Sequence, residues 1–414
     1  MEEPGPGATR RAVETLLGAP FEEGNAVQVL HDGDAVFGAL LGEVRAAARS
    51  VDLLWFVWEP GPVTDEVVGA LADAGRRGVR VRVLLDSFGA LPVERSRVRA
   101  LRSAGCTVAF YKPLLTRRLT TINRRLHRRV LVCDEQVGLT GGTGIAQGWT
   151  GHAQDPDHYR DTAVVVRGPA VTGLRTAFAQ AWQQTPYPLV TPADLFPPVR
   201  RPGDTAAAVL RASSQAGWNE AALAVRALLL VARHRVRVTS PYVRLAGRLH
   251  RLLAETVARG VQVQVLVTGD HSDRPVIQWQ SEPHLGRLLD AGVEVWTYRP
   301  TMMHGKVVTV DGRLAMVGTT NLDQRSMTLN EQVGLVVDDA RVTGELDDRF
   351  DADLDRSDRL DPGEWRGRAR WRRLRATLAD RAGTPFRGAG GEGLTRPGSA
   401  RAARRAAEAA RPDR

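Results

Sequence analysis

The sequence predicts an α/β protein built from two similar halves, on two observations. Strand-like and helix-like segments alternate in the same order before and after a proline-rich stretch at residues 186–208, and this alternation is typical of a parallel or mixed sheet covered by helices. A set of polar residues with one fixed spacing also occurs once in each half, which indicates an internal repeat. We therefore expect two domains, at 25–185 and 209–360, joined by a linker at 186–208.

The first half contains the segments that one such domain needs. Residues 1–24, rich in Gly, Pro and Glu, are expected to be loose. Runs of β-branched and other apolar residues predict the strands, and apolar residues three or four positions apart predict the helices. The predicted strands are 26–30, 51–58, 79–85 and 107–111, and the predicted helices are 35–48, 66–78, 93–104 and one through Phe178 and Trp182.

The second half repeats this order and is followed by a basic C-terminal region. Residues 361–387 combine Trp, Leu and Arg in a pattern that predicts a basic amphipathic helix. We expect this helix to pack onto the domain, with contact to a membrane as the alternative. Residues 388–414 are dominated by Arg, Ala and Gly and are expected to be a disordered tail. The predicted helices are 218–231, 246–259 and 282–291, and the predicted strands are 236–240, 261–267 and 293–298.

The polar repeat is clearest in the second half. His304 and Lys306 are two residues apart in front of a valine-rich run, and that spacing on a strand places both side chains on one face. A glycine turn at Gly318 then brings Thr319 and Asn321 back toward the same face. These groups can together grip a phosphate, with an ammonium, a hydroxyl and an amide as donors.

The first half carries the same repeat in altered form. His127 lies seven residues before Asp134, and the corresponding acid in the second half is Asp311. A pair of glycines ending in Gly142 follows, and then Thr143. Arg129 stands where the second half has Lys306, and Gly144 stands where it has Asn321. The positive charge is kept, whereas the amide is lost and only the Thr143 hydroxyl could contribute in its place.

Composition limits the class of protein. The chain of 414 residues has a net charge of +10 and a pI near 10.5, which favours polyanionic partners. Its two cysteines fit a reducing compartment and are too few for a disulfide framework. No apolar run has the length of a membrane span and no signal-like segment opens the chain. We expect a cytoplasmic protein, peripheral to the inner face of the cell membrane.

The two His-x-Lys/Arg-x4-Asp runs, each followed by a glycine turn, resemble the signature of the phospholipase D superfamily. Within it, the segment from Asn321 through Asn330-Glu331 is similar to bacterial cardiolipin synthases. The resemblance implies two phospholipase D-like α/β/α halves related by a pseudo-two-fold axis, with the active site at their interface. It further implies that His127 is the nucleophile, that His304 is the general acid and base, and that Asp161 and Glu331 orient the imidazoles. The motif acids Asp134 and Asp311 lie too far along their strands and are expected to be structural.

The residues themselves predict the chemistry. Lys306 and Arg129 can neutralise a phosphodiester, and hydrogen bonds from Thr319 and Asn321 can stabilise its oxygens. A neutral imidazole can then attack phosphorus and form a phosphohistidine, while a protonated imidazole supplies the leaving group with a proton. No metal ion or other cofactor is implied, because imidazoles and basic residues already supply these functions.

We expect a monomeric phosphatidyltransferase that converts two molecules of phosphatidylglycerol into cardiolipin and glycerol at an anionic membrane surface. Two alternatives remain open at this point. The same chemistry could serve a phospholipase D-type hydrolase or a nuclease, because the net charge of +10 also suits nucleic acid. The departures at Arg129 and Gly144 could instead mark a catalytically silent protein that binds anionic membranes or nucleic acid.

Overall fold

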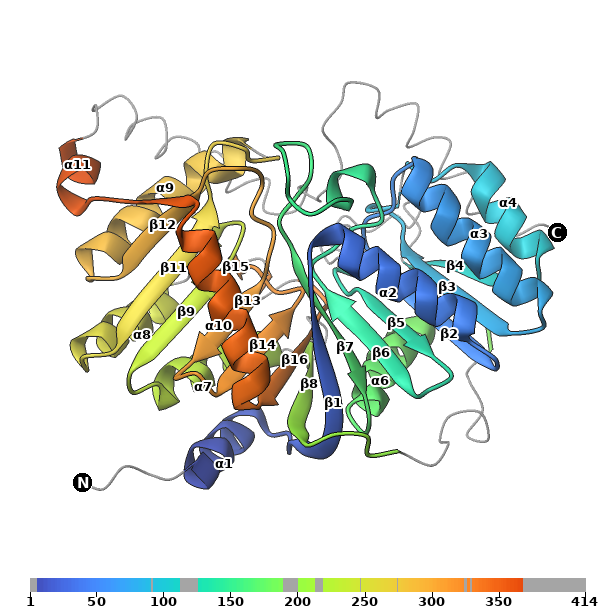
Figure 1. Ribbon diagram of the computed structural model, residues 1–414, viewed down its shortest axis with the longest axis horizontal. Coiled ribbons are helices and arrows are strands. Elements are labelled where there is room, and N and C mark those ends of the chain that lie inside the picture. The colour runs from blue at the N-terminus through green and yellow to red at the C-terminus, as the bar shows by residue number, and fades with distance from the viewer. Residues whose placement is uncertain are drawn as a thin grey trace.

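A single sheet of fifteen strands runs through the computed structural model, which describes residues 6–90, 92–111, 126–188, 200–212, 219–245, 247–273, 275–323, 326–327 and 330–367. The strand order is β17-β12-β11-β9-β13-β14-β16-β8-β1-β7-β6-β5-β2-β3-β4, with β8 and β1 at the centre (Figure 1). Outward from this centre the two halves repeat one order of strands. The prediction of two similar α/β halves is therefore confirmed.

The first half consists of three parallel strands at the outer edge and antiparallel strands toward the centre. Strands β2, β3 and β4 are parallel, and β5, β6, β7 and β1 continue the sheet in antiparallel pairs. The elements are β1 Glu22–His31, α2 Asp32–Ala46, β2 Ser50–Trp55, α3 Pro62–Arg76, β3 Arg80–Asp86, α4 Arg95–Ser103, β4 Thr107–Tyr111, β5 Val130–Cys133, β6 Val137–Gly141, the 3-10 turn η1 Gln147–Trp149, β7 Thr162–Arg167 and α6 Val171–Trp182.

The second half follows the same plan. Strands β9, β11 and β12 are parallel, and β13, β14, β16 and β8 form antiparallel pairs. The elements are β8 Thr205–Ala212, α7 Glu220–Val231, β9 Arg235–Thr239, β10 Val243–Arg244, α8 Gly247–Ala258, β11 Gln262–Thr268, α9 Pro275–Asp290, β12 Glu294–Tyr298, β13 Val307–Val310, β14 Leu314–Gly318, β15 Leu322–Asp323, β16 Gln332–Asp338, α10 Ala340–Leu354, β17 Ser357–Arg359 and α11 Pro362–Gly367.

The halves pack against each other and are not merely joined at an edge. Strands β1 and β8 pair only between Glu22 and Ala207 and between Asn25 and Thr205, with a register shift between these pairs. Beyond this joint, β6 contacts β14 and β16, and β7 contacts β14. One hydrophobic cluster draws on strands of both halves, whereas two others fill one half each. Burial of this shared cluster fixes the interface at which the site is expected.

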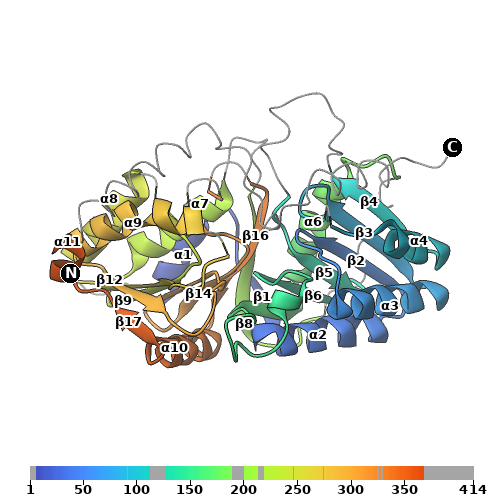
Figure 2. The same ribbon diagram turned by 90° about the horizontal axis from the view of Figure 1, so that it is seen from above.

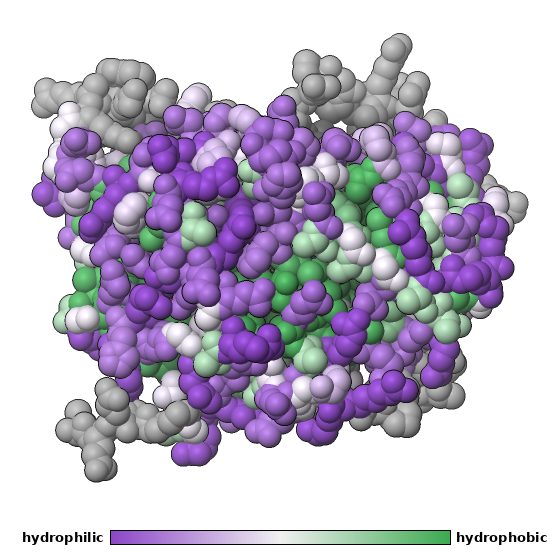
Figure 3. All heavy atoms as spheres, in the orientation of Figure 1, coloured by the Kyte–Doolittle hydropathy of each residue, from purple (hydrophilic) through white to green (hydrophobic). Residues whose placement is uncertain are grey.

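Helices cover both sides of the sheet. Seen from above in Figure 2, α2, α3 and α10 lie along one side and α6, α7, α8 and α9 along the other. The face shown in Figure 3 is largely hydrophilic, and hydrophobic residues gather near its middle. Within the described ranges, no helix combines the length and the hydrophobicity that crossing a bilayer requires.

The expectation that residues 1–24 are loose is wrong for their described part. Residues Pro6–Leu17 form helix α1, and β1 already begins at Glu22. Val13 and Leu17 lie four residues apart and are both buried in the core of the second half, where α1 contacts α7. This apolar stripe on one helical face stabilises a segment that its Gly and Pro content suggested to be irregular.

The expected linker and C-terminal region are only partly described. Strand β8 begins at Thr205, inside the 186–208 linker, because Thr205 pairs with Asn25 of β1 and the alanines that follow pair with β16. Residues 189–199 lie outside the described structure. At the C-terminus α11 ends at Gly367, with Trp365 against the second core. The rest of the helix predicted at 361–387, and the tail predicted at 388–414, lie outside the described residues.

Candidate active site

Equivalent hairpins position the two histidines. In the first half β5 and β6 form an antiparallel pair, and in the second half β13 and β14 do the same. His127 lies three residues before β5, and His304 lies three residues before β13. Arg129 and Lys306 directly precede these strands. Apolar residues predominate in β5 and β13, and the polar residues lie at the ends of these buried strands.

The residue just before each histidine pairs with a residue of the other half. Met303 forms a parallel bridge with Arg160, and Leu126 forms one with Glu331. The backbone N–H of His304 donates to the carbonyl of Arg160 at 2.7 Å. Each histidine therefore stands at the interface between the halves, where the site was predicted.

His304 is surrounded by an acid and a cation. Its Nδ1 lies 2.7 Å from Oδ2 of Asp161, which belongs to the first half. The Nζ of Lys306 lies 3.0 Å from both ring nitrogens and donates to the His304 carbonyl at 2.6 Å. The side chains of His304 and Asp161 are each 1% exposed. Because the pair is shielded from water, its electrostatic coupling is strong.

Asp161 is held as a carboxylate. Burial alone would raise its pKa, but the charge and hydrogen bond of His304, together with Lys306, bring the pKa below its ordinary value. The backbone N–H of Thr162 also donates to Asp161 Oδ1 at 2.8 Å. This fixed negative charge offsets the Lys306 ammonium beside His304 and so permits the ring to carry a proton.

Trp149, which sequence reasoning did not identify, completes this cluster. Its indole Nε1–H donates to Asp161 Oδ2 at 3.0 Å and lies 3.3 Å from His304 Nδ1. The two rings are edge to face, with centroids 5.0 Å apart. A Cβ at Gly144 would lie 2.8 Å from the indole ring. The indole thus occupies the space beside Gly144, where the second half carries the Asn321 amide.

His127 has a different partner. Its Nδ1 lies 3.1 Å from Oε1 of Gln332, a residue that is completely buried. The Thr319 hydroxyl lies 2.5 Å from the same oxygen. The Phe56 ring packs on His127 at 4.7 Å, and the Arg129 guanidinium lies 5.8 Å from the centre of that ring. The side-chain partner of His127 is therefore an amide, whereas that of His304 is a carboxylate.

Strand registers show that these two partners are equivalent. Gly141 at the end of β6 pairs with Ala163, and Gly318 at the end of β14 pairs with Gly334. Two residues before each pairing partner stand Asp161 and Gln332, respectively. The position that carries an acid in the first half carries an amide in the second.

Glu331, predicted to orient an imidazole, lies one residue earlier, at the position equivalent to Arg160. Its Oε2 accepts a hydrogen bond from the guanidinium of Arg128 at 3.0 Å, and both side chains are buried. Counting from the histidine led to Glu331. Counting back from the apolar run that forms β16, as Asp161 directly precedes β7, would have led to Gln332.

The predicted phosphate-binding residues lie in the glycine turns. A Cβ at Gly142 would lie 2.4 Å from Asp161 Oδ1, and one at Gly318 would lie 2.5 Å from the opposing backbone, so both positions require glycine. Three buried oxygens nearby have no hydrogen-bond partner within the described structure, and buried polar groups are normally paired. They are Thr143 Oγ1, Thr320 Oγ1 and Asn321 Oδ1; the two hydroxyls can donate to a bound phosphate, whereas the amide oxygen of Asn321 only accepts.

The motif aspartates lie at the other ends of their strands. Asp134 accepts hydrogen bonds from the backbone N–H groups of three successive residues, 48–50, at 2.7–2.9 Å. Asp311 does the same for residues 233–235 at 2.8–2.9 Å. Both also adopt a positive φ at the turn. These contacts anchor the hairpins, as a structural role requires.

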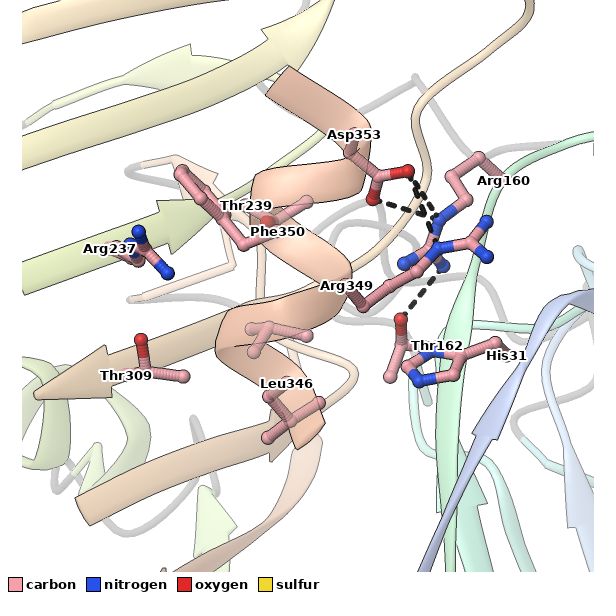
Figure 4. Close-up of a pocket in the computed structure, with 11 residues that line it drawn as sticks. His31, Arg160, Thr162, Arg237, Thr239, Thr309, Leu346, Arg349, Phe350 and Asp353 are labelled. Carbon is pink, nitrogen blue, oxygen red and sulfur yellow. Dashed lines mark hydrogen bonds and ion pairs between the residues drawn. The ribbon is translucent and has the colours of Figure 1, made fainter. Parts of the chain in front are cut away.

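A buried ion-pair network stabilises the contact between the two halves next to His304. Arg160 contacts Asp353 of α10 at 3.0 Å (Figure 4). Asp32 lies 3.4 Å from Arg160 and 3.0 Å from Arg349. Asp32 and Arg160 come from the first half, whereas Asp353 and Arg349 come from the second. Because Arg160 directly precedes Asp161, this network fixes the acid that contacts His304.

Paired histidines, an acid and cations between two α/β halves define an enzyme that acts on phosphoesters, and comparisons agree. Residues 40–182 and 225–354 match the family model described as cardiolipin synthase, phospholipase D-like domain. The chain is 30% identical to cardiolipin synthase A of Serratia proteamaculans over 370 residues, which cover 85% of this chain and 74% of that protein. The cardiolipin synthase A of Edwardsiella ictaluri is also 30% identical, with 87% and 76% covered.

Solved structures show the same fold. The phosphatidylserine synthase of Haemophilus influenzae superposes with a TM-score of 0.71 at 15% identity, covering 92% of this chain and 99% of that one. The polyphosphate kinase of Porphyromonas gingivalis gives 0.53 at 12% identity, covering 81% and 49%. The chain belongs to the cardiolipin synthase family of phospholipase D-like proteins. It is a phosphatidyltransferase-type enzyme, as the sequence predicted.

Proposed function

We propose that this protein transfers a phosphatidyl group from one phosphatidylglycerol to another and produces cardiolipin and glycerol. One observation carries the proposal: His304 is held between Asp161 and Lys306, while His127 of the other half has its Nδ1 against an amide oxygen. The two imidazoles are thus prepared for different protonation states. Double displacement at phosphorus requires one of each.

The reaction proceeds in two balanced steps. Nε2 of His127 attacks phosphorus, the bond to the departing glycerol oxygen breaks, and His304 gives that oxygen a proton. His304 then takes a proton from the glycerol hydroxyl of a second phosphatidylglycerol. The oxygen of that hydroxyl attacks phosphorus and releases His127. Lys306 and Arg129 offset the phosphate charge, and donors in the Gly142 and Thr319 turns stabilise its oxygens.

The substrate places the enzyme at a membrane surface. Phosphatidylglycerol is anionic, and a net charge of +10 attracts the protein to a negatively charged bilayer. We place the protein at the inner face of the cell membrane, as a monomer, because one chain supplies both histidines and their partners.

The test is mass spectrometry of lipids after incubation of the full-length protein with phosphatidylglycerol vesicles. Wild type is compared with His127→Ala and His304→Ala, and His152→Ala is the control because its side chain is 74% exposed. Cardiolipin and glycerol from wild type and His152→Ala alone support the proposal. A phosphatidyl adduct recovered on His127 of the wild-type protein, and absent from His127→Ala, supports the assignment of the nucleophile.

Other products would redirect the assignment. Phosphatidic acid in place of cardiolipin would identify a hydrolase. Cleavage of nucleic acid with no lipid product would identify a nuclease. Binding of anionic vesicles with no product from either substrate would identify a silent binding protein.

A further inference from the structure

The two equivalent positions beside the histidines differ in charge, and this difference assigns a task to Gln332. Asp161 contacts His304 at 2.7 Å, and Gln332 contacts His127 at 3.1 Å. We infer that Gln332 is a positioning residue that holds His127 as a neutral imidazole with its proton on Nδ1. This inference rests on the proposed function, in which His127 Nε2 attacks phosphorus.

The hydroxyl of Thr319 identifies which amide atom faces the site. It lies 2.5 Å from the Gln332 atom that also contacts His127. A separation of 2.5 Å suits O–H···O geometry and is too short for an amide N–H donor. The contacting atom is therefore the oxygen Oε1. The backbone N–H of Val333 donates to the Thr319 hydroxyl at 3.1 Å. Two acceptors are within reach of the hydroxyl proton, the Val333 carbonyl at 3.1 Å and Gln332 Oε1 at 2.5 Å, and the shorter separation assigns the proton to Gln332.

An amide oxygen only accepts hydrogen bonds, so Nδ1 of His127 must be the donor. A neutral imidazole has one proton. With that proton on Nδ1, the lone pair lies on Nε2, the atom that attacks phosphorus. A carboxylate in place of Gln332 would accept the same hydrogen bond, but its charge would also stabilise the imidazolium, which has no lone pair to offer.

Other charged groups surround His127 and are shared by all variants at position 332. Arg129 follows on the same segment, and Arg128 is paired with Glu331. The carboxylate of Asp86 accepts a hydrogen bond from the backbone N–H of residue 126 at 3.0 Å. Lys306 and His304 lie across the interface. Because none of these changes, a difference between variants reports residue 332 alone.

The experiment is ¹⁵N NMR of histidine side chains in the full-length protein, with His127→Ala used to assign the signals. Near neutral pH, wild-type His127 is expected to show a protonated Nδ1 and an unprotonated Nε2. Gln332→Met, similar in size but without an acceptor, is expected to mix the two tautomers and to slow phosphohistidine formation on the order of 10²-fold. Gln332→Glu is expected to keep the tautomer and to carry the imidazolium to higher pH. Gln28→Met, at an exposed position of β1, is the control and is expected to match wild type.

A wild-type proton on Nε2 would overturn the inference, as would an unchanged His127 spectrum in both Gln332 variants. The spectra need no substrate, so they separate this inference from the proposed function. A protein with the expected tautomer that yields no cardiolipin would contradict the phosphatidyl transfer but not the role of Gln332.

Discussion

The carboxylate of Asp161 lies 2.7 Å from Nδ1 of His304, although the two residues belong to different halves of the chain. The partner of His127 also comes from the opposite half, since Gln332 begins β16. Each half therefore contributes one histidine and the group that governs the other histidine. Changes at the interface are expected to act on chemistry as strongly as changes to the imidazoles.

Replacing Asp161 with Asn keeps the size of the side chain but removes its charge. Without the carboxylate the His304 imidazolium is less stable, so proton transfer to the leaving glycerol slows. We expect cardiolipin formation to fall by roughly 10²-fold or more. Rates on phosphatidylglycerol vesicles measure the effect, with the exposed Asp157→Asn as the control. Equal rates for Asp161→Asn and wild type would contradict the role given to Asp161.

The substitution Gly144→Asn gives the first half the amide that the second half has at Asn321. The added Cβ would lie 2.8 Å from the Trp149 ring and 3.1 Å from Val57. Such overpacking costs about 1–3 kcal/mol. We therefore expect Gly144→Asn to lower the free energy of unfolding, measured with urea, and not to raise activity. Gly38→Asn on α2 is the control, because no atom lies within 4 Å of the added Cβ. A more active Gly144→Asn protein would show instead that the first half is a decayed copy.

The ion pair between Arg160 and Asp353 is buried, with side chains 4% and 3% exposed. Removing one partner of such a pair leaves an uncompensated charge and costs about 3–5 kcal/mol. Asp353→Asn is expected to destabilise the protein by this order and to reduce activity through the displaced Asp161. Asp355→Asn, exposed at the end of the same helix, is the control. If Asp353→Asn and Asp355→Asn had the same midpoint of urea unfolding, the predicted loss of stability would be refuted.

Stability is expected to fall on acidification because of His31. Its pKa drops from 6.5 to about 3, since burial and the charges of Arg160 and Arg349 disfavour the imidazolium. Glu345, at 3.9 Å, is the acidic group facing it. The unfolded chain takes up a proton near pH 6.5 and the folded protein only near pH 3, so unfolding gains one proton in this window. That uptake lowers the free energy of unfolding by about 1.4 kcal/mol per pH unit.

The variant His31→Gln lacks this titration. Its free energy of unfolding is expected to depend less steeply on pH than that of wild type, by one proton, across the same window. Urea unfolding at a series of pH values measures the slope. His152→Gln, exposed at the surface, is expected to keep the wild-type slope. An unchanged slope in His31→Gln would show that another group accounts for acid sensitivity.

The repeated motif predicted the two halves and the paired histidines because its spacing is local and strict. The spacing of the motifs could not show that each histidine contacts a residue of the other half. The contact between Asp161 and His304 depends on how the two halves pack together. Trp149 escaped notice because an aromatic residue in an irregular loop has no periodic pattern. The predicted partner, Glu331, is one residue away from the observed partner, Gln332. The number of residues between a histidine and the following strand depends on loop length, which varies freely. The start of the apolar run is a better reference, because the sheet fixes its position.

Helix α1 escaped prediction for a related reason. Its stripe of Val13 and Leu17 gains stability only against α7, more than 200 residues away in the sequence. Local composition, rich in Gly and Pro, suggested an irregular segment. Tertiary packing outweighed that preference.

Covalent fusion of the halves has a consequence for how the site could diverge. In a symmetric dimer of identical subunits, a substitution beside one histidine is copied beside the other, so both must share one kind of partner. A single chain removes that restriction. Asp161 and Gln332 can then differ, and the nucleophile and the proton donor can be tuned separately, one substitution at a time.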